Sequence, residues 1–308
     1  MKLIKPSFTI IEQGPGLEGI YRQIELAGRT CYKSEDKITP TSAKEFVDRM
    51  IKSGHGAMLE HGTVYLHMEF DSKKAYFDDE LALKYHCNPH TKVHRVRDVD
   101  TDPNGKQHAY ITTNLRVLVE NEWLDDLKYL CEPTEYHTKR YTVKFTCDRG
   151  VTHEFVRHRV FSFAQESTRY CNYSKDKFGN EVTFIIPEWC PEIREDSDKG
   201  WDPCSIYDKF YLQHLKMAED TYFNLLKQWD EKIPDKRYKS GFRNNPWTPQ
   251  QARAVLPNSL KTELVMTGFV SDWKHFFFLR DAVSAHPQAR ELAEPLHSTF
   301  IQREYIKD

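Results

Sequence analysis

The sequence predicts an α+β fold in which an antiparallel sheet is packed with helices and the C-terminal third is helical. Segments 64–70 and 141–147 alternate apolar and polar residues with the two-residue period of half-buried strands. In the last third, apolar residues recur at helical spacing instead. Because strands come early and helices late, we expect a layered α+β arrangement rather than one built from βαβ units.

Two helices are expected before the first strand. Residues 17–28 carry leucines and isoleucines at roughly helical spacing. Ser42 followed by Glu45 is a capping box that would open the second helix, and Gly54 would end it.

The strand at 141–147 should lead through a turn at 148–150 into a helix that reaches Arg157. A further strand is expected at 182–186. It should end there, because Pro187 has no backbone N–H to donate to the next hydrogen bond between strands.

Four helices are expected in the C-terminal third. Residues 205–229 carry a broad apolar stripe, and Thr248 and Gln251 form a capping box around a Pro at the first helical position. A long helix through 260–280 and a final helix over about 288–303 complete the chain.

Residues 71–140 form a self-contained passage. Segments 93–99 and 108–119 flank the turn sequence at 102–105, so a hairpin is expected there. A short helix around 122–130 would close the passage.

Composition limits the classes of function. The chain has 308 residues with 44 Lys+Arg and 46 Asp+Glu, and this near-neutral balance disfavours a non-specific nucleic-acid binder. No apolar run is long enough for a membrane span, and the N-terminus does not look like a signal peptide. Seven scattered cysteines suggest reduced thiols, so we expect a cytoplasmic protein.

The densest chemical feature is the segment 157–170. It contains three arginines, one histidine and two serines, and such side chains can hold several anionic groups at once. A solvated basic surface is the alternative. The interleaved Val160, Phe161 and Phe163 weaken that alternative, because they would anchor the segment in a core.

This segment resembles the RHRxxSxxxxSxRY pattern of flavin-dependent thymidylate synthases, with every fixed position present. Further family elements occur in order, at 28–32, 54–61, 252–257, 278–280 and 285–288. The resemblance covers about 15–70 and 141–300 and implies one domain over 1–308, with an insertion at 71–140.

The resemblance also implies roles for individual residues. FAD would be bound by His55, Glu60, Arg157, His158, Arg159 and His286. The dUMP phosphate would be bound by Ser167 and Arg169, with Gln165 and Glu166 nearby, and the uracil would face Arg253 and Arg280.

The implied reaction is methylation of dUMP to dTMP. NADPH would reduce FAD, and 5,10-methylenetetrahydrofolate would supply the carbon. Arg280 is the catalytic candidate, because a donor at a ring carbonyl stabilises charge as it develops. No cysteine occupies a nucleophile position, since Cys171 follows the motif and Cys31 stands where Ser is also accepted. Family members are homotetramers in which several subunits build each site.

Several positions depart from the family pattern, among them Ala164-Gln165, where many members have Asn-Glu. Glu154 stands where compact members often have Gln, and we exclude it from the substrate site because a carboxylate repels phosphate. Phe269, Ser271 and His275 stand where other side chains often touch the flavin, so the sequence leaves those flavin contacts open.

Other interpretations remain open at this point. Cys87, His90 and His94 have a spacing that could supply three zinc ligands, but no fourth ligand pairs with them, so we expect no metal. Arg280 could instead pair structurally with Asp281 or Glu291. An RNA-binding module, a nucleotide hydrolase or a different flavoprotein reductase are the competing functions, and a flavin spectrum would separate them.

Overall fold

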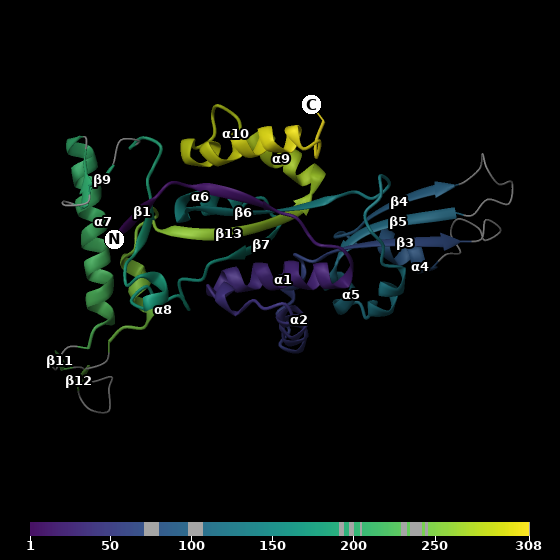
Figure 1. Ribbon diagram of the computed structural model, residues 1–308, viewed down its shortest axis with the longest axis horizontal. Helices are drawn as coiled ribbons and strands as arrows, with labels where there is room; N and C mark the ends of the chain where they lie inside the picture. The colour runs from purple at the N-terminus through teal and green to yellow at the C-terminus, as the bar shows by residue number, and fades with distance from the viewer. Residues whose placement is uncertain are drawn as a thin grey trace.

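The computed structural model describes residues 1–70, 80–97, 107–190, 194–196, 200–203, 205–228, 233–234, 242–243 and 246–307. A four-stranded antiparallel sheet with the order β2-β6-β13-β7 lies at its centre (Figure 1). These strands are β2 (Ser7–Ile11), β6 (Arg140–Asp148), β13 (Lys261–Phe269) and β7 (Ser162–Gln165). β6 and β13 pair over nine residues each, so they form the backbone of the sheet.

Helices cover both faces of this sheet (Figure 1). On one face, Phe145 and Leu264 pack with Phe155, Trp273 and Phe300 in a single buried cluster. The helices there are α6 (Arg149–Phe155), α9 (Val270–Arg280) and α10 (Pro287–Gln302). The other face is covered by α1 (Gly16–Tyr32), with α2 (Ser42–Lys52) beyond it.

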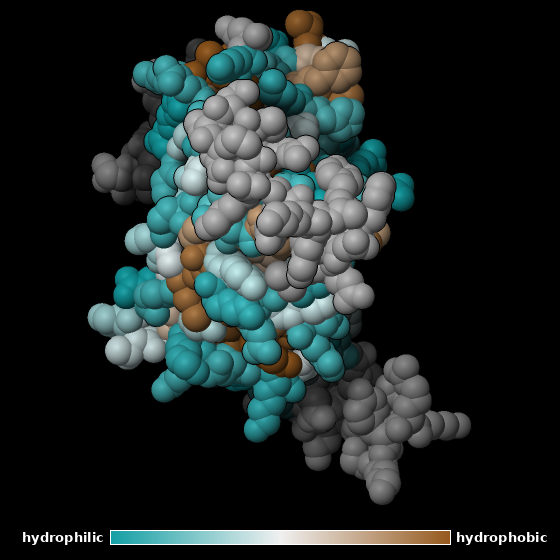
Figure 2. Space-filling model, turned by 90° about the vertical axis from the view of Figure 1, so that its right-hand side faces the viewer, coloured by the Kyte–Doolittle hydropathy of each residue, from teal (hydrophilic) through white to brown (hydrophobic). Residues whose placement is uncertain are grey.

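A second sheet of three strands lies at the right-hand end of Figure 1, with the order β3-β5-β4. Its strands are β3 (Thr63–Phe70), β5 (Gln107–Asn114) and β4 (Lys92–Arg97). Leu66, Met68 and Ile111 point to a buried cluster that also contains Phe46 and Val47 of α2. Around this sheet lie α4 (Glu80–His86), α5 (Leu115–Glu120) and η2 (Leu124–Tyr129). The end face in Figure 2 is mostly hydrophilic, with smaller hydrophobic patches.

A third cluster lies at the opposite end, under α7 (Ile206–Leu226). Leu215 and Tyr222 of this helix pack against Phe184, and β8 (Thr183–Ile185) pairs in parallel with β1 (Lys2–Ile4). The remaining elements are η1 (Glu35–Lys37), α3 (Gly56–Leu59), η3 (Asp176–Phe178), β9 (Arg194–Asp196), β10 (Gly200–Asp202), β11 (Ile233–Pro234), β12 (Phe242–Arg243), α8 (Pro249–Ala252) and η4 (Arg253–Val255). No helix among the described residues has both the length and the apolar character needed to cross a membrane.

The predicted α+β class is confirmed, as are the helix at 17–28, the strands at 64–70, 141–147 and 182–186, and the final helix. The hairpin strands are confirmed as β4 and β5, whereas the predicted turn at 102–105 lies outside the described residues. The single domain over 1–308 and the insertion at 71–140 stay predictions.

The predicted long helix at 260–280 was wrong for its first half. Residues 261–269 are the strand β13, and the helix α9 begins only at Val270. β13 lies between β6 and β7 and is buried on both faces, so its side chains do not alternate between apolar and polar. A short apolar run of this kind cannot be told from a buried helix by periodicity.

Three other boundaries differ because of side-chain hydrogen bonds and local packing. Ser42 is not the cap of α2, since its hydroxyl donates to Glu25 Oε2 at 2.9 Å and Thr41 occupies the cap position. β5 ends at Asn114 rather than at 119, because the Asn114 side chain accepts from the Val117 amide at 3.2 Å and caps α5. The helix expected around 122–130 is the 3₁₀ segment η2.

The apolar stripe predicted for 205–229 was wrong in part. Ile206 and Phe210 are 54% and 61% exposed, whereas Leu212 is buried in their place. Trp229 lies outside the described residues.

Candidate functional site

The loop that follows β7 carries the second half of the predicted motif and is fixed on both sides. The Glu166 amide donates to the Glu263 carbonyl on β13 at 2.8 Å. The Ser167 amide donates to the Cys31 carbonyl near the end of α1 at 2.9 Å. Gln165 pairs with Leu264 in the ladder, and its side chain donates to Thr152 Oγ1 at 3.0 Å. The backbone of this loop is therefore clamped between the central strand and α1.

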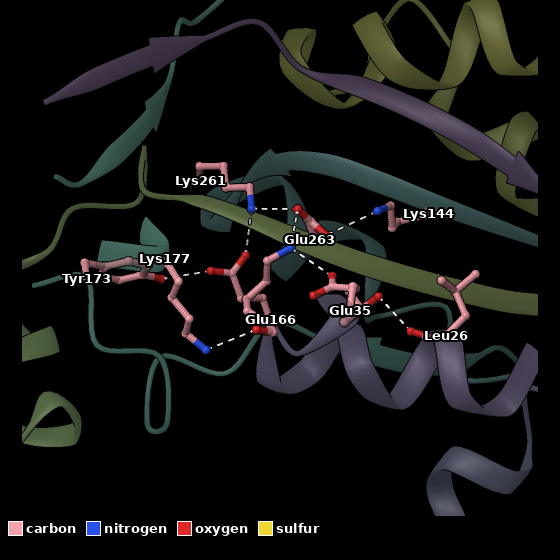
Figure 3. Close-up of polar contacts among 10 residues, drawn as sticks. Leu26, Glu35, Lys144, Glu166, Tyr173, Lys177, Lys261 and Glu263 are labelled. Atoms are coloured by element: carbon pink, nitrogen blue, oxygen red, sulfur yellow. Dashed lines mark hydrogen bonds and ion pairs between the residues drawn. The ribbon is translucent and has the colours of Figure 1, made fainter. Parts of the chain in front are cut away.

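Next to the loop lies a largely buried ion cluster, which we define as Lys33, Glu166, Lys261 and Glu263. Figure 3 labels the last three of these residues. Lys261 Nζ donates to Glu166 Oε2 at 2.9 Å and to Glu263 Oε1 at 2.8 Å. Lys33 Nζ reaches the same Glu263 oxygen at 2.9 Å, and Tyr173 donates to Glu166 Oε1 at 3.2 Å. The Glu166 side chain is only 1% exposed, so its charge depends on these partners.

The attraction between opposite charges in the cluster outweighs the free-energy cost of burying them. Burial alone would raise the pKa of Glu263, but Lys261 and Lys33 lower it to about 2. Burial would lower the pKa of Lys261, yet Glu166 and Glu263 raise it above its ordinary value. Glu263 and Lys261 are therefore both ionised at neutral pH.

Two exposed arginines meet at this loop, Arg169 within it and Arg253 on η4. Arg253 of η4 donates from Nη1 to Thr168 Oγ1 at 3.0 Å, which brings it to the loop. Arg169 lies 5.4 Å from the centre of the Tyr170 ring, and that ring lies 5.3 Å from Tyr32. Exposed guanidinium groups beside hydroxyls can bind a phosphate in bidentate fashion.

A second group forms around Arg280 at the end of α9. Its guanidinium donates from Nη1 to Glu154 Oε2 at 2.7 Å and from Nη2 to the Glu154 carbonyl at 2.8 Å. Its Nε donates to His158 Nε2 at 3.0 Å. Asp281 and Glu291 were the structural partners considered from the sequence, but the carboxylate that pairs with Arg280 is that of Glu154. Glu154, excluded from the substrate site on sequence grounds, is the carboxylate that holds Arg280.

His158 is held as a neutral imidazole. Burial lowers its pKa to about 4, with Arg280 and His275 adding to the effect. Since Nε2 accepts from Arg280, the ring proton lies on Nδ1. Its flanking residues Arg157 and Arg159 are both exposed.

The segment 157–161 is anchored by Phe161. The Phe161 and Trp273 ring centres are 4.7 Å apart, and Phe161 lies over Gly268 of β13. A Cβ atom at position 268 would come within 2.6 Å of the Phe161 ring, so a glycine is needed there. This contact fixes an otherwise exposed loop to the core.

The remaining predicted residues lie in separate places. His55 lines a cavity of about 730 Å³ together with Arg29, Arg49, Lys37 and Lys177. Tyr32, Phe46 and Asp36 line the same cavity, so it combines several cations with two aromatic rings and one carboxylate.

His286 lines another cavity, of about 380 Å³, together with Glu154 and Trp189. Glu60 pairs with Arg116 at 2.5 Å, and its carbonyl accepts from Arg140. The described contacts thus bring Ser167, Arg169 and Arg253 together, and His158 with Arg280. His286 lines the same cavity as Glu154, which holds Arg280, and the cavity of His55 includes Tyr32, which packs on Tyr170 of the loop.

Sequence reasoning missed Lys33, Lys261 and Glu263. Lys261 and Glu263 were missed because residues 260–280 were predicted to form a helix, whereas 261–269 form the strand β13. Lys33 follows α1 in a left-handed conformation with φ of 47°, which turns the chain back toward the loop. Pro257 shortly before the segment, together with its β-branched and apolar residues, was the signal that favoured a strand.

Comparisons with known proteins are consistent with one another. A family model described as thymidylate synthase complementing protein matches residues 130–303, more than half of the chain. A flavin-dependent thymidylate synthase of Corynebacterium glutamicum is 22% identical over 285 residues, which cover 92% of this chain and 76% of the relative. One of Mycobacterium tuberculosis is 31% identical over 150 residues, 47% of this chain and 50% of the relative. The crystal structure of a UMP/dUMP methylase PolB from Streptomyces cacaoi bound with 5-Br dUMP was also found. Its alignment covers 98% of this chain and 93% of the PolB chain, with 16% sequence identity and a TM-score of 0.40.

Replacing Glu263 by Gln should remove the charge that joins the two lysines of the cluster. We expect the free energy of unfolding at pH 7 to fall by about 2 kcal/mol, because Lys33 and Lys261 each lose one charged hydrogen-bond partner and keep the other, Glu35 and Glu166. The pKa of Glu263 is depressed, so its stabilisation is complete above about pH 4.5 and is lost as the pH falls toward about 2. The difference between wild type and variant should therefore shrink across that window.

Urea unfolding at pH 7 and at pH 3 measures both effects. Glu18→Gln is the control, because its ion pair with Arg22 is exposed and contributes at most about 1 kcal/mol. If Glu263→Gln were as stable as Glu18→Gln at pH 7, the cluster would not hold the loop.

Proposed function

We propose that this protein methylates dUMP to dTMP. The proposal starts from the fact that the chain belongs to the flavin-dependent thymidylate synthase family. The observation that carries the proposal is the loop after β7, which the ion cluster fixes and where the exposed Arg169 is joined by Arg253 of η4. Ser167 and Arg169 would bind the phosphate of dUMP, and Arg253 would reach the nucleotide from η4. The Glu166 amide and carboxylate both have partners inside the chain, so Glu166 would act by fixing the loop, with Gln165 beside it.

FAD would be the cofactor, with NADPH and 5,10-methylenetetrahydrofolate as co-substrates, and it would supply the redox chemistry when bound. Arg157 and Arg159 are exposed and would meet a pyrophosphate, Arg157 from beside Glu154 with which it forms an ion pair at 4.0 Å. The cation-lined cavity at His55 fits the same chemistry. His158 would offer the flavin a neutral imidazole that carries its proton on Nδ1. His286 and Glu60 are the remaining residues that we propose to bind FAD.

Arg280 would be the catalytic residue that polarises the uracil carbonyl, with its guanidinium preorganised by Glu154 and His158. A positioned donor lowers the barrier because it needs no reorganisation as charge develops on the ring. Glu154 would act as a positioning residue through Arg280 and would not contact the phosphate.

We also propose that no cysteine attacks the uracil ring. Burial raises the pKa of Cys31 to about 11 and that of Cys171 to about 12, so both stay protonated at neutral pH. The thiolate form, which the covalent mechanism needs, is therefore disfavoured at the two cysteines nearest the loop.

A homotetramer would complete the site. Val160 is 67% exposed within the motif, and Phe278 and Val283 are 76% and 86% exposed next to Arg280. Large apolar side chains beside a polar site are typical of surfaces that another subunit covers.

Turnover tests the proposal as a whole. Purified protein with dUMP, 5,10-methylenetetrahydrofolate, NADPH and FAD should form dTMP, and omission of FAD from flavin-free protein should abolish it. Replacing Cys31 or Cys171 by Ala should leave turnover within about threefold, because neither thiol reacts. A protein that neither binds flavin nor forms dTMP would exclude this function, and loss of turnover in one cysteine variant that still binds dUMP and FAD would restore a thiolate mechanism.

Arg280→Ala should slow methylation by about 10²-fold, because a donor to the uracil is lost. Glu154→Ala is the matched variant, since it breaks the same ion pair and keeps the guanidinium. We expect it to slow the reaction by less than about tenfold. Equal rates in both variants, together with equally lower stability, would reduce Arg280 to a structural residue.

A further inference from the structure

One face of the three-stranded sheet carries a group of metal-binding side chains. β3 pairs with β5 so that Glu69 stands opposite His108 and His67 stands opposite Tyr110. Paired residues in a ladder share a face, and residues two apart on a strand do as well. His67, Glu69 and His108 therefore project from the same side, opposite to the buried Leu66, Met68 and Ile111.

The ligand atoms of these three side chains lie close together. One atom from each of His67, Glu69 and His108 falls within 4.8 Å of the others, and His67 Nε2 is 3.0 Å from His108 Nδ1. Nitrogen and oxygen ligands bind Zn²⁺ at about 2.0–2.2 Å, which places neighbouring ligands of a tetrahedral site roughly 3.3 Å apart. The two imidazoles are thus already near the spacing that one shared ion requires.

Stacking holds the two imidazole rings in place. The His67 ring lies 4.5 Å from Tyr110 with an angle of 2° between the planes, and 5.2 Å from His108 with an angle of 22°.

We propose that His67, Glu69 and His108 bind a divalent transition-metal ion of the Zn²⁺ class, with water as a further ligand, and that this ion ties β3 to β5. Two imidazoles and one carboxylate are the donor set of such ions, whereas Ca²⁺ and Mg²⁺ prefer oxygen ligands alone. The site lies on a different sheet from the loop at 166–170, so its role is to stabilise the three-stranded sheet.

This site differs from the zinc pattern considered in the sequence. Cys87 and His90 are exposed before β4, and His94 stacks on Tyr136 with ring centres 5.9 Å apart. Among the described residues, the group of three that is close enough to share an ion is the one on β3 and β5. The sequence did not predict it, because its members are separated by about forty residues and meet only through strand pairing.

Calorimetric titration with ZnSO₄ tests the proposal on the full-length, flavin-loaded protein after removal of metals with a chelator. Wild type should bind one equivalent tightly, and Zn²⁺ should raise its melting temperature. His108→Gln and Glu69→Gln should each weaken that binding by about 10²-fold or more and abolish the shift in melting temperature. The double variant Cys87→Ser/His90→Gln is the control and should bind within about twofold of wild type.

Two results would overturn the proposal. The first is a wild-type protein that binds no Zn²⁺. The second is Zn²⁺ binding that survives in His108→Gln and Glu69→Gln but disappears in the Cys87→Ser/His90→Gln control. Having two ligand variants keeps the test decisive if one of them fails to fold.

Discussion

The site depends on charges that are buried where three distant parts of the chain meet. Lys33 follows α1, Glu166 follows β7, and Lys261 and Glu263 lie on the central strand β13 (Figure 3). Lys261 bridges Glu166 and Glu263, Lys33 also pairs with Glu35, and Glu263 also pairs with Lys144, so the charges form one connected network in which each ion pair supports the next. The four groups therefore stay together, and they hold α1, the loop and the sheet in one relative position.

This constraint gives an exposed loop the rigidity that ligand binding requires. Glu166 is fixed by its side chain and by its amide, so Ser167 and Arg169 leave the sheet from a defined point. On the other side of the motif, Phe161 packs over Gly268 and anchors the segment that carries Arg157–Arg159. Both halves are thus fastened to β13, and their charged side chains remain exposed. Ligand binding therefore costs little conformational entropy in the loop, because the loop is already ordered.

The sequence was sufficient to predict the α+β class, most elements and the residues of the motif, because these depend on local periodicity and spacing. It was not sufficient for β13, whose double burial removes alternation, and so the partners of Glu166 were missed. The partner of Arg280 was missed for a related reason. Glu154 and Arg280 are 126 residues apart, and only the packing of α6 against α9 and the sheet brings them together. The histidines of β3 and β5 also meet only through strand register.

The central claim is that the anchored loop presents Arg169 to the phosphate of dUMP, and calorimetric titration with dUMP tests it most directly. Arg169→Ala should weaken dUMP binding by about 30-fold, the equivalent of roughly 2 kcal/mol, because a charge-assisted phosphate contact is lost. Flavin content should stay at the wild-type level. Arg303→Ala is the control and should not change the affinity, since this exposed arginine pairs with Glu12 at the other end of the chain. Unchanged dUMP affinity in a folded Arg169→Ala protein would contradict the account.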